Sequence, residues 1–471
     1  MDFIQGIVDA VNDVVWGWPM LILLVGTHIF LTIRLKFIQS ATFTGIKLTF
    51  AKDPEATGDV SQWGALATAL AATLGTGNIV GVANGVVRGG PGAVLWLWFT
   101  GAYGIATKYS EAIVAIKYRV RTSDGMMLGG PMYACERGLN MKWLGVLFSI
   151  FTAIACFGIG NMVQVNSITE NWYDTFGVPR VAVGVVLTVL TIIVIVGGIK
   201  SIAKVAEAVI PFMAILFLLG NLYVLFGVNG AYIGEAIGLI FASAFSYKAV
   251  YGGFVGYGVM QAARFGIARG LFSNEAGLGS APIAAAAATT RNPVRQGLVS
   301  MSQVFWDTII LCAVTGTVYV STLLRAFDGT GINPFVNDDG DALIRGAIFA
   351  KTVFSVIPGV GSAFVAICIL LFAWTTILGW GYYGERAVEY LAGKKAIKPF
   401  KIVYSLAVFI GSITAVDLVF DIADMFNAFM AFPNLITLIA LSGVIAGLTK
   451  EYLWDKNLDA IDSESIMVID N

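Results

Sequence analysis

The sequence is short of charge. Only 13% of its 471 residues are Asp, Glu, Lys or Arg, against roughly 25% in an average soluble domain, and 57% are hydrophobic. A chain with about half the usual charge cannot keep its own surface in water. We therefore expect lipid to cover much of the molecule, which excludes a soluble enzyme.

Other absences narrow the function further. The net charge of −1 argues against nucleic acid as a partner, because phosphate binding requires a basic footprint. His28 is the single histidine, which excludes a histidine-based metal site and Ser/His or Cys/His catalysis, so no enzyme is expected. Four cysteines without paired spacing are interpreted as small buried hydrophobic residues: Cys135, Cys156, Cys312 and Cys368.

Long apolar runs are what the sequence has instead. A membrane-spanning helix needs about 20 mostly apolar residues to cross a hydrocarbon core about 30 Å thick. Eleven runs meet this requirement, so the sequence predicts an all-α membrane protein with about eleven spans. They are residues 15–33, 63–87, 92–116, 143–169, 180–198, 205–227, 236–263, 300–323, 358–383, 402–420 and 425–448.

Basic residues gather in alternate loops. Because cytoplasmic loops are enriched in Lys and Arg, this pattern predicts an external N-terminus and a cytoplasmic C-terminus. The polar tail from Lys450 to Asn471 is expected to be frayed, without chemistry of its own. The residues assigned to the cytoplasmic side include Arg34, Lys117, Arg119, Arg137, Lys200, Arg264, Arg269, Arg291, Arg295 and Lys394.

Glycines and polar residues interrupt the second span near its middle, at Gly75, Thr76, Gly77 and Asn78. Unpaired backbone groups in hydrocarbon cost several kcal/mol each, so an unwound stretch survives only where it lines a cavity. Its N–H groups can hold a carboxylate, and its free carbonyl groups can coordinate a cation. The alternative is that the glycines only let a neighbouring helix approach.

A second glycine cluster, residues 251–258, lies five spans later. This spacing is expected of a five-plus-five inverted repeat in which a broken helix opens each half, and tight packing is the alternative. The following stretch, residues 264–288, begins with too many polar residues to face lipid. We expect it to form a re-entrant or surface helical element at the cytoplasmic side.

Polar side chains inside predicted spans are costly and often functional. Thr375 and Thr376 are adjacent in the ninth span and could supply two hydroxyl oxygens to a hard cation such as Na⁺. Asn161 and Gln164 are three residues apart in the fourth span and share a helix face. They either contact a substrate or hold helices together.

Two carboxylates need an explanation. Asp307 lies in the eighth span and is a functional candidate, although the cytoplasmic end is near enough for an arginine partner or for snorkelling. Glu275 is either a cation ligand or the partner of a helix end or an arginine.

Three segments carry a distinctive pattern. They are GTGNIVGVANGVVRGGPGAVLWLWFTGAYGIATKYSE (Gly75–Glu111), RGLFSNEAGLGSAP (Arg269–Pro282) and GWGYYGERAVEYLAG (Gly379–Gly393). Together they resemble the alanine or glycine:cation symporter family, also called sodium:alanine symporters, and the likeness extends from about Trp63 to about Gly447. One departure, Leu95-Trp96-Leu97-Trp98 where many members have Phe-Trp-Met-Trp, is conservative.

The resemblance implies a LeuT-type bundle of the amino acid-polyamine-organocation superfamily in the plasma membrane of a prokaryote. Residues 1–62 would form an extra N-terminal helix and a cytoplasmic linker. Residues 63–229 and 230–448 would form the two inverted repeats, the second with a cytoplasmic helical element at 264–299, and residues 449–471 a cytoplasmic tail. Na⁺ would be the coupling ion, with no organic cofactor, and L-alanine, D-alanine or glycine the substrate.

The resemblance to the bacterial leucine transporter also assigns roles around the first break. The amides of Thr76 and Gly77 would hold the substrate carboxylate. Thr73 and Asn78 would contribute to a sodium that touches the substrate.

A second set of residues would hold another sodium between the second and ninth spans: the backbones of Ala71 and Leu74, with Thr375 and Thr376. The further candidate substrate contacts are Asn78, Asn161, Gln164, Gly253, Phe254 and Trp374.

Secondary active symport by alternating access is the expected function. A proton-coupled small amino acid transporter is the alternative, in which Asp307 or Glu275 would have to titrate. An ion channel is a weaker alternative, because channels display repeated filter loops or charged rings that this sequence lacks.

Overall fold

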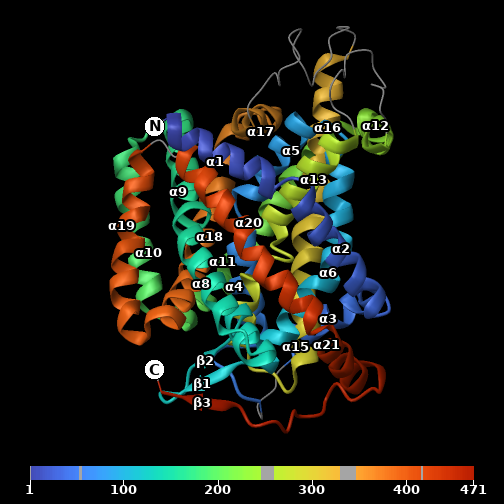
Figure 1. The fold of residues 1–471 in the computed structure, drawn as a ribbon. Helices are drawn as coiled ribbons and strands as arrows, with labels where there is room; N and C mark the ends of the chain where they lie inside the picture. Colours follow the sequence, from blue (N-terminus) through green and yellow to red (C-terminus); the bar gives the residue numbers. More distant parts are fainter. Residues whose placement is uncertain (1, 52–55, 246–258, 329–345, 415–416, 471) are drawn as a thin grey trace.

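Breaks and π-helical turns interrupt the long helices of this bundle. The computed structural model describes residues 2–51, 56–245, 259–328, 346–414 and 417–470 (Figure 1). Within these ranges seven helical segments are long and apolar enough to cross a membrane, and a bent pair of helices supplies up to one more. The chain is therefore a multi-pass, mainly α-helical membrane protein, as predicted, and the count of eleven spans stays a prediction.

The first half of the chain contains the helices up to α11. α1 lies across the end of the bundle that is opposite the strands (Figure 1). The helices are α1 (Asp2–Val15), α2 (Trp18–Arg34), α3 (Thr42–Leu48), α4 (Gln62–Thr73), α5 (Val82–Gly89), α6 (Ala93–Lys117), α7 (Pro131–Tyr133), α8 (Lys142–Phe157), α9 (Val163–Phe176), α10 (Arg180–Val196) and α11 (Gly198–Leu222).

The second half contains the remaining helices. These are α12 (Ile233–Phe245), α13 (Val259–Asn274), α14 (Ala281–Ala285), α15 (Pro293–Val304), α16 (Ala313–Phe327), α17 (Gly346–Phe354), α18 (Gly361–Ala392), α19 (Ile397–Ile413), α20 (Asp417–Ala440) and α21 (Ser442–Thr449). π-Helical turns join several of them, among them η2 (Gly77–Gly81), η4 (Gly158–Met162) and η7 (Phe305–Cys312). Such turns leave backbone groups outside the regular helical ladder and are frequent at functional sites.

Local sequence explains where two of the inner helices begin. The Ser61 side chain accepts a hydrogen bond from Gly64 N at the start of α4, and Asn292 accepts one from Arg295 N at the start of α15. Both are preferred N-cap residues, and Pro293 occupies the first turn of α15, where its missing N–H has no consequence.

The first break lies where the sequence predicts it. α4 ends at Thr73, and the chain turns through 52° before it continues as Gly77–Gly89. Leu74 already leaves the helix, with ψ of 87°. The break is buried, since Thr76 is 5% exposed and Asn78 is fully buried.

The structure shows another break at residues 275–280, between α13 and α14. Glu275, Gly277 and Gly279 all have positive φ, at 55°, 99° and 84°. Two of these positions are glycines, which adopt this conformation without the steric cost that a Cβ brings. The glycine cluster predicted as the second break, residues 251–258, lies outside the described residues.

The alternative of a surface helical element at residues 264–288 is wrong, because most of this stretch is buried, and the re-entrant alternative stays a prediction. α13 packs against α5 and α6, and residues 273–288 are all buried. Figure 1 shows α13 close to α1 and α5, at the end of the bundle away from the strands. Arg264 forms an ion pair with Asp13 of α1 there, whereas Arg291 contacts the C-terminal tail at the opposite end. Arg264 and Arg291, which the sequence assigned to the same cytoplasmic side, therefore lie at opposite ends of the bundle.

The C-terminal tail is also ordered, contrary to the expectation that it is frayed. Its strand β3 (Met467–Ile469) runs parallel to β1 (Val120–Thr122), with Val120 opposite Met467. β2 (Met127–Leu128) pairs antiparallel with the other edge of β1, which gives the order β2-β1-β3. The partner that orders the tail lies in the loop after α6, far away in the sequence.

Glycine permits a close helix contact in the centre of the bundle. A Cβ added at Gly160, in η4, would overlap with Cβ of Trp380 in α18. Trp380 is among the largest fully buried side chains, so it has no open space to enter. The packing of η4 on α18 thus depends on the missing side chain.

We expect Gly160→Ala to reduce the free energy of unfolding by about 1–3 kcal/mol, because overpacking forces buried side chains or backbone to shift. Thermal unfolding in detergent measures the change. Gly238→Ala in α12 is the matched control, since nothing lies within 4 Å of its added Cβ. An equal melting temperature for Gly160→Ala and the unchanged chain would contradict the packing argument.

Candidate functional site

The hydroxyl of Thr376 meets the first break. Its Oγ1 lies 3.2 Å from the Ala71 carbonyl oxygen and 3.3 Å from that of Leu74, and 3.1 Å from the Phe372 carbonyl of its own helix. A hydroxyl carries one hydrogen, so it donates to one of these oxygens at a time. The oxygens of Ala71, Leu74 and Thr376 thus lie together in a buried place, and an all-oxygen donor set is what hard cations take.

Gly75 makes this approach possible. A Cβ at that position would lie 2.5 Å from Oγ1 of Thr376. A glycine is therefore required here for a steric reason. It allows α18 to bring the Thr376 hydroxyl close to the free carbonyl groups at the end of α4.

Three other predicted site residues make their contacts away from the first break. The Thr375 hydroxyl donates within α18, to Leu371 or Phe372, and lies 3.7 Å from Sδ of Met213 in α11. Trp374 Nε1 donates to Thr191 of α10, and Asn161 Nδ2 donates to the Tyr404 carbonyl of α19. For Asn161 the contact is the interhelical one that the sequence allowed as an alternative.

Gln164 lies on the other side of the break. Its Oε1 accepts a hydrogen bond of 3.3 Å from Thr76 N, while its Nε2 donates to the Ile159 carbonyl oxygen. A buried amide oxygen thus occupies the place from which an anionic oxygen could reach the same N–H. Gly77 faces α13, where its added Cβ would be 3.2 Å from the Phe272 ring. Gly253 and Phe254 lie outside the described residues.

Asp307 joins the two broken spans. It is fully buried in η7, and its Oδ1 accepts a hydrogen bond of 2.6 Å from Asn78 Nδ2. Ser273, the penultimate residue of α13, donates to Oδ2 at 2.9 Å, and Thr308 donates to the same oxygen at 2.7 Å. These described partners are neutral donors, so the expected snorkelling or arginine partner is not how this carboxylate is satisfied.

Thr73 belongs to the same network through Gln303 of α15. Gln303 Nε2 donates to Thr73 Oγ1 at 3.0 Å and approaches the Asn274 carbonyl oxygen at 3.4 Å. Asn274 Nδ2 in turn donates to Thr308. Thr73 and Asn78, which the sequence placed at one sodium site, are therefore linked through residues at the end of α13 and in α15–η7.

Glu111 of α6 accepts hydrogen bonds from the backbone of the second break, residues 275–280. Its Oε1 accepts hydrogen bonds of 3.0 Å from both Gly277 N and Gly279 N, and one of 2.7 Å from Asn434 Nδ2 of α20. Lys108 lies one turn earlier, with Nζ 3.8 Å from Glu111 Oε2. Both side chains are at most 1% exposed. Backbone N–H groups freed by the break thus find a carboxylate partner inside the bundle.

Sequence reasoning did not single out Lys108, Glu111 or Ser273. A signal for the first two was present, since oppositely charged residues three apart inside a predicted span need each other. Glu275, which the sequence offered as a cation ligand, accepts a hydrogen bond from Ser280 of its own loop at 2.5 Å.

A cavity of about 280 Å³ lies between α1, α13 and α20, at the end of the bundle away from the strands. Its floor includes Phe420, whose ring centroid is 6.3 Å from that of Phe272, and Phe272 is the ring that faces Gly77. Two aromatic rings therefore separate this cavity from the first break. The charged residues lining it are Asp9, Asp13, Arg88, Arg264, Arg269, Asp421 and Asp424.

Comparisons with known proteins agree over nearly the whole chain. The profile described as "Sodium:alanine symporter family" matches residues 1–465. The sodium/alanine symporter AgcS of Methanococcus maripaludis is 48% identical over 96% of this chain and 98% of its own length. An uncharacterized transporter of Haemophilus influenzae is 46% identical over 98% of this chain and 99% of its own.

Among solved structures, the crystal structure of MhsT in complex with L-phenylalanine superposes with a TM-score of 0.53. The match covers 86% of this chain and 94% of that one, at 17% sequence identity. This likeness concerns the fold alone, and it confirms the predicted LeuT-type arrangement.

Glu111→Ala should destabilise the fold strongly, because it leaves the N–H groups of Gly277 and Gly279, the Asn434 amide and the Lys108 ammonium without their buried partner. Each unsatisfied donor costs about 1–3 kcal/mol. Glu111→Gln keeps one carbonyl oxygen for these donors and should lose less stability. Combining Glu111→Gln with Lys108→Met should recover part of that loss. Melting temperatures in detergent test the order, and a Glu111→Ala protein as stable as the unchanged chain would refute it.

Proposed function

The chain belongs to the sodium:alanine symporter family, and we propose that it couples inward Na⁺ movement to uptake of a small neutral amino acid, alanine or glycine, by alternating access. The relative that is 48% identical is a sodium/alanine symporter, and the family is one of transporters rather than enzymes. A multi-pass protein of this family belongs in the plasma membrane, with L-alanine, D-alanine or glycine as its cargo.

One observation carries the sodium part of the proposal. The carbonyl oxygens of Ala71 and Leu74 and the hydroxyl of Thr376 converge on one buried space at the first break. Na⁺ takes oxygen ligands, and carbonyl groups released by an unwound helix are a recurring source of them in transporters. Thr375 contributes no oxygen to this group, because its hydroxyl is turned toward α11.

A second cation position is proposed around Asp307. Its carboxylate, the Asn78 amide and the Ser273 hydroxyl meet within hydrogen-bond distance of one another, and Thr73 joins them through Gln303. A buried carboxylate whose hydrogen-bond partners are neutral favours a bound cation. This position would be the sodium site beside the substrate to which the resemblance assigned Thr73 and Asn78.

The substrate position is proposed between the two breaks. The amides of Thr76 and Gly77 would hold the carboxylate of the amino acid, displacing the Gln164 oxygen from Thr76 N. Phe272 would form the wall beside Gly77 and limit the size of the substrate side chain. Packing alone discriminates an added methylene by about 1–3 kcal/mol, so larger side chains must be excluded by direct overlap with this ring.

Coupling follows from the shared first break. At the first proposed cation position, Thr376 connects the first break to α18. At the second, Asn78 connects the break to Asp307 and to Ser273 at the end of α13. Cations bound at these two places would fix the backbone that presents the Thr76 and Gly77 amides. An ion drives transport only if it favours the state that binds the substrate, and this arrangement supplies such a preference.

The orientation is proposed from the tail. The end of the bundle that carries β1, β2 and the C-terminus also carries Lys117, Arg119 and Arg291, as expected of a cytoplasmic face. The N-terminal helix α1 would then lie outside.

Uptake of labelled alanine into proteoliposomes tests the proposed symport. We expect an inward Na⁺ gradient to raise the initial rate at least about tenfold over Na⁺-free buffer, because coupling free energies of this size are usual between linked sites. Labelled phenylalanine should not be taken up. An uptake rate that does not change with Na⁺ but rises with an inward proton gradient would contradict sodium coupling and support proton coupling.

The two threonines provide a matched pair for the sodium position. Thr376→Ala should raise the Na⁺ concentration for half-maximal alanine binding about tenfold, because one ion ligand worth about 1.4 kcal/mol is lost. Thr376→Ser keeps the hydroxyl and should stay near the unchanged chain. Thr375→Ala should also change little, since its hydroxyl faces Met213. Equal effects of Thr375→Ala and Thr376→Ala would reject the proposed geometry.

A further inference from the structure

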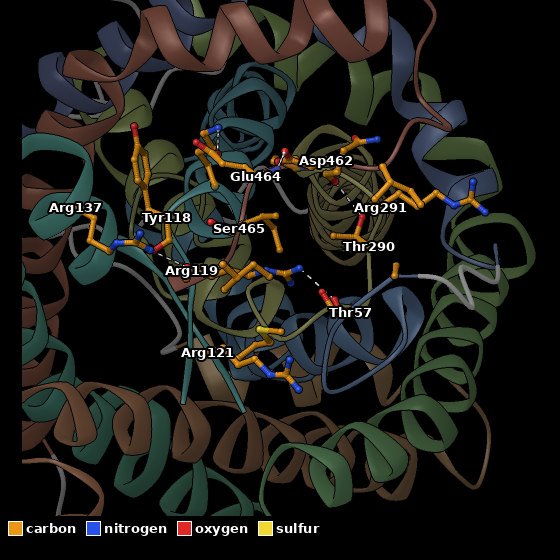
Figure 2. Close-up of a pocket in the computed structure, with 18 of the residues that line it drawn as sticks. Thr57, Tyr118, Arg119, Arg121, Arg137, Thr290, Arg291, Asp462, Glu464 and Ser465 are labelled. Atoms are coloured by element: carbon orange, nitrogen blue, oxygen red, sulfur yellow. Dashed lines mark hydrogen bonds and ion pairs between the residues drawn. The ribbon is translucent and has the colours of Figure 1, made fainter. Parts of the chain in front are cut away.

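A cavity of about 600 Å³ opens at the end of the bundle that carries the strands (Figure 2). Its cationic lining comes from the end of α6, from β1 and the residue before it, from the π-helical turn after α7 and from the segment before α15: Lys117, Arg119, Arg121, Arg137 and Arg291. The acidic residues that line it, Asp462 and Glu464, both belong to the C-terminal tail. The tail therefore forms one wall of this cavity, which we call the inner mouth.

Arg119 joins the inner ends of both broken spans beneath the tail. Its Nη2 donates to the Thr57 carbonyl oxygen, ahead of α4, and its Nη1 donates to the carbonyl oxygens of Ala286 and Ala288, after α14. The Arg119 residue is 5% exposed. Figure 2 shows Arg119 directed at Thr57, with Asp462 and Glu464 on the same cavity.

Backbone hydrogen bonds strengthen the same junction. Asp59 N donates to the Ala287 carbonyl oxygen and Thr289 N donates to that of Val60, both at 2.8 Å. These bonds tie the segment before α4 to the segment after α14, and an opening from the two breaks to this end of the molecule would have to part them. Arg119 is thus at the contact that closes the inner mouth.

Burial lowers the pKa of Arg119 to about 10, and the charges of Asp59 and Asp462 oppose this shift. The guanidinium therefore remains charged at neutral pH. Because Asp462 is a tail residue, the tail supports the charge that holds the junction.

The tail is anchored on the α15 side of the cavity. Asp462 N donates to the Arg291 carbonyl oxygen at 2.8 Å, and Asn292 Nδ2 donates to the carbonyl oxygens of Leu458 and Ala460, both at 2.9 Å. Arg295 also forms an ion pair with Asp459 at 2.6 Å.

The tail is anchored again on the α6 side. Glu464 forms an ion pair with Lys117, and β3 adds to the edge of β1. Ser123 N donates to the Ile469 carbonyl oxygen at 3.1 Å, just beyond the strand. Residues 458–469 consequently cross the inner mouth from the start of α15 to the loop after α6.

We propose that residues 458–469 are a strap that keeps the inner mouth closed and detaches when the two inner helix halves separate. This rests on the proposed transport function only in requiring that the mouth opens. The anchors suit a reversible contact: the Glu464 side chain is 60% exposed, exposed ion pairs contribute little, and β3 is three residues long. Release of the strap therefore shifts the population toward the inward-facing state.

Cleavage of the strap in the folded protein tests this without relying on a truncated chain. A protease site is inserted in the exposed bend at Lys456, and Thr290→Cys serves as reporter, because Thr290 lines the cavity and is 4% exposed. The four native cysteines are buried. Cleavage at this position, just before the strap, is followed by washing that removes the released peptide. A membrane-impermeant maleimide is applied to inside-out vesicles before cleavage and again after the peptide has been lost.

We expect cleavage to accelerate labelling of the reporter thiol at position 290 about fivefold or more, in keeping with a shift of a minor open population. In the uncut protein Glu464→Gln should accelerate labelling about twofold, because it removes one anchor. Asp470→Asn removes the same charge from an exposed tail position beyond β3 and should leave the rate unchanged.

An unchanged labelling rate after complete cleavage would overturn the strap, and so would a lower melting temperature with no change in labelling, which would make the tail a brace of the fold. Labelling needs neither Na⁺ nor alanine. Faster labelling after cleavage, in a protein that transports no alanine, would therefore support the strap proposal and contradict the proposed transport function.

Discussion

Unwound backbone inside a membrane needs hydrogen-bond partners, and this requirement organises the centre of the molecule. At the first break, Asn78 Oδ1 accepts from Gly75 N and the Thr376 hydroxyl meets free carbonyl groups. At the second break, Glu111 accepts from two glycine amides. Water cannot supply these partners in hydrocarbon, so side chains from neighbouring helices must. The same side chains decide which helices surround each break.

The two breaks are connected by one carboxylate. Asp307 accepts from Asn78 in the first break and from Ser273 just before the second, so a displacement of either broken span changes the surroundings of the other. The residues that the structure places between the two breaks are mostly small or amide-bearing. In a chain with so few charges, hydroxyl, amide and backbone groups surround the few buried charged side chains of the site, Asp307, Glu111 and Lys108.

Features that depend on neighbours in the sequence could be predicted, and features that depend on distant partners could not. The Gly75–Asn78 break followed from its own glycines, and the fold from motifs along the chain. Thr375 and Thr376 could not be distinguished, because successive helix residues point about 100° apart and the rotation of α18 is set by packing. Asn161 finds its partner on α19 and Glu111 finds its partners on α13–α14 and α20, contacts between residues far apart in the sequence. Counting basic residues placed Arg264 and Arg291 on the same side, because such a count ignores the pairing of Arg264 with Asp13 and of Arg291 with the tail.

The pairing of β3 with β1 has a consequence for biosynthesis. The two strands are separated by about 350 residues, so at usual rates of translation β1 waits roughly 20–70 s for its parallel partner. The helices of the bundle have left the ribosome's decoding centre before β3 is made, since β3 follows all of them in the chain. During that interval the newly inserted bundle has β1 exposed at one edge, so a chaperone or the ribosome surface has the opportunity to protect this edge until β3 is made.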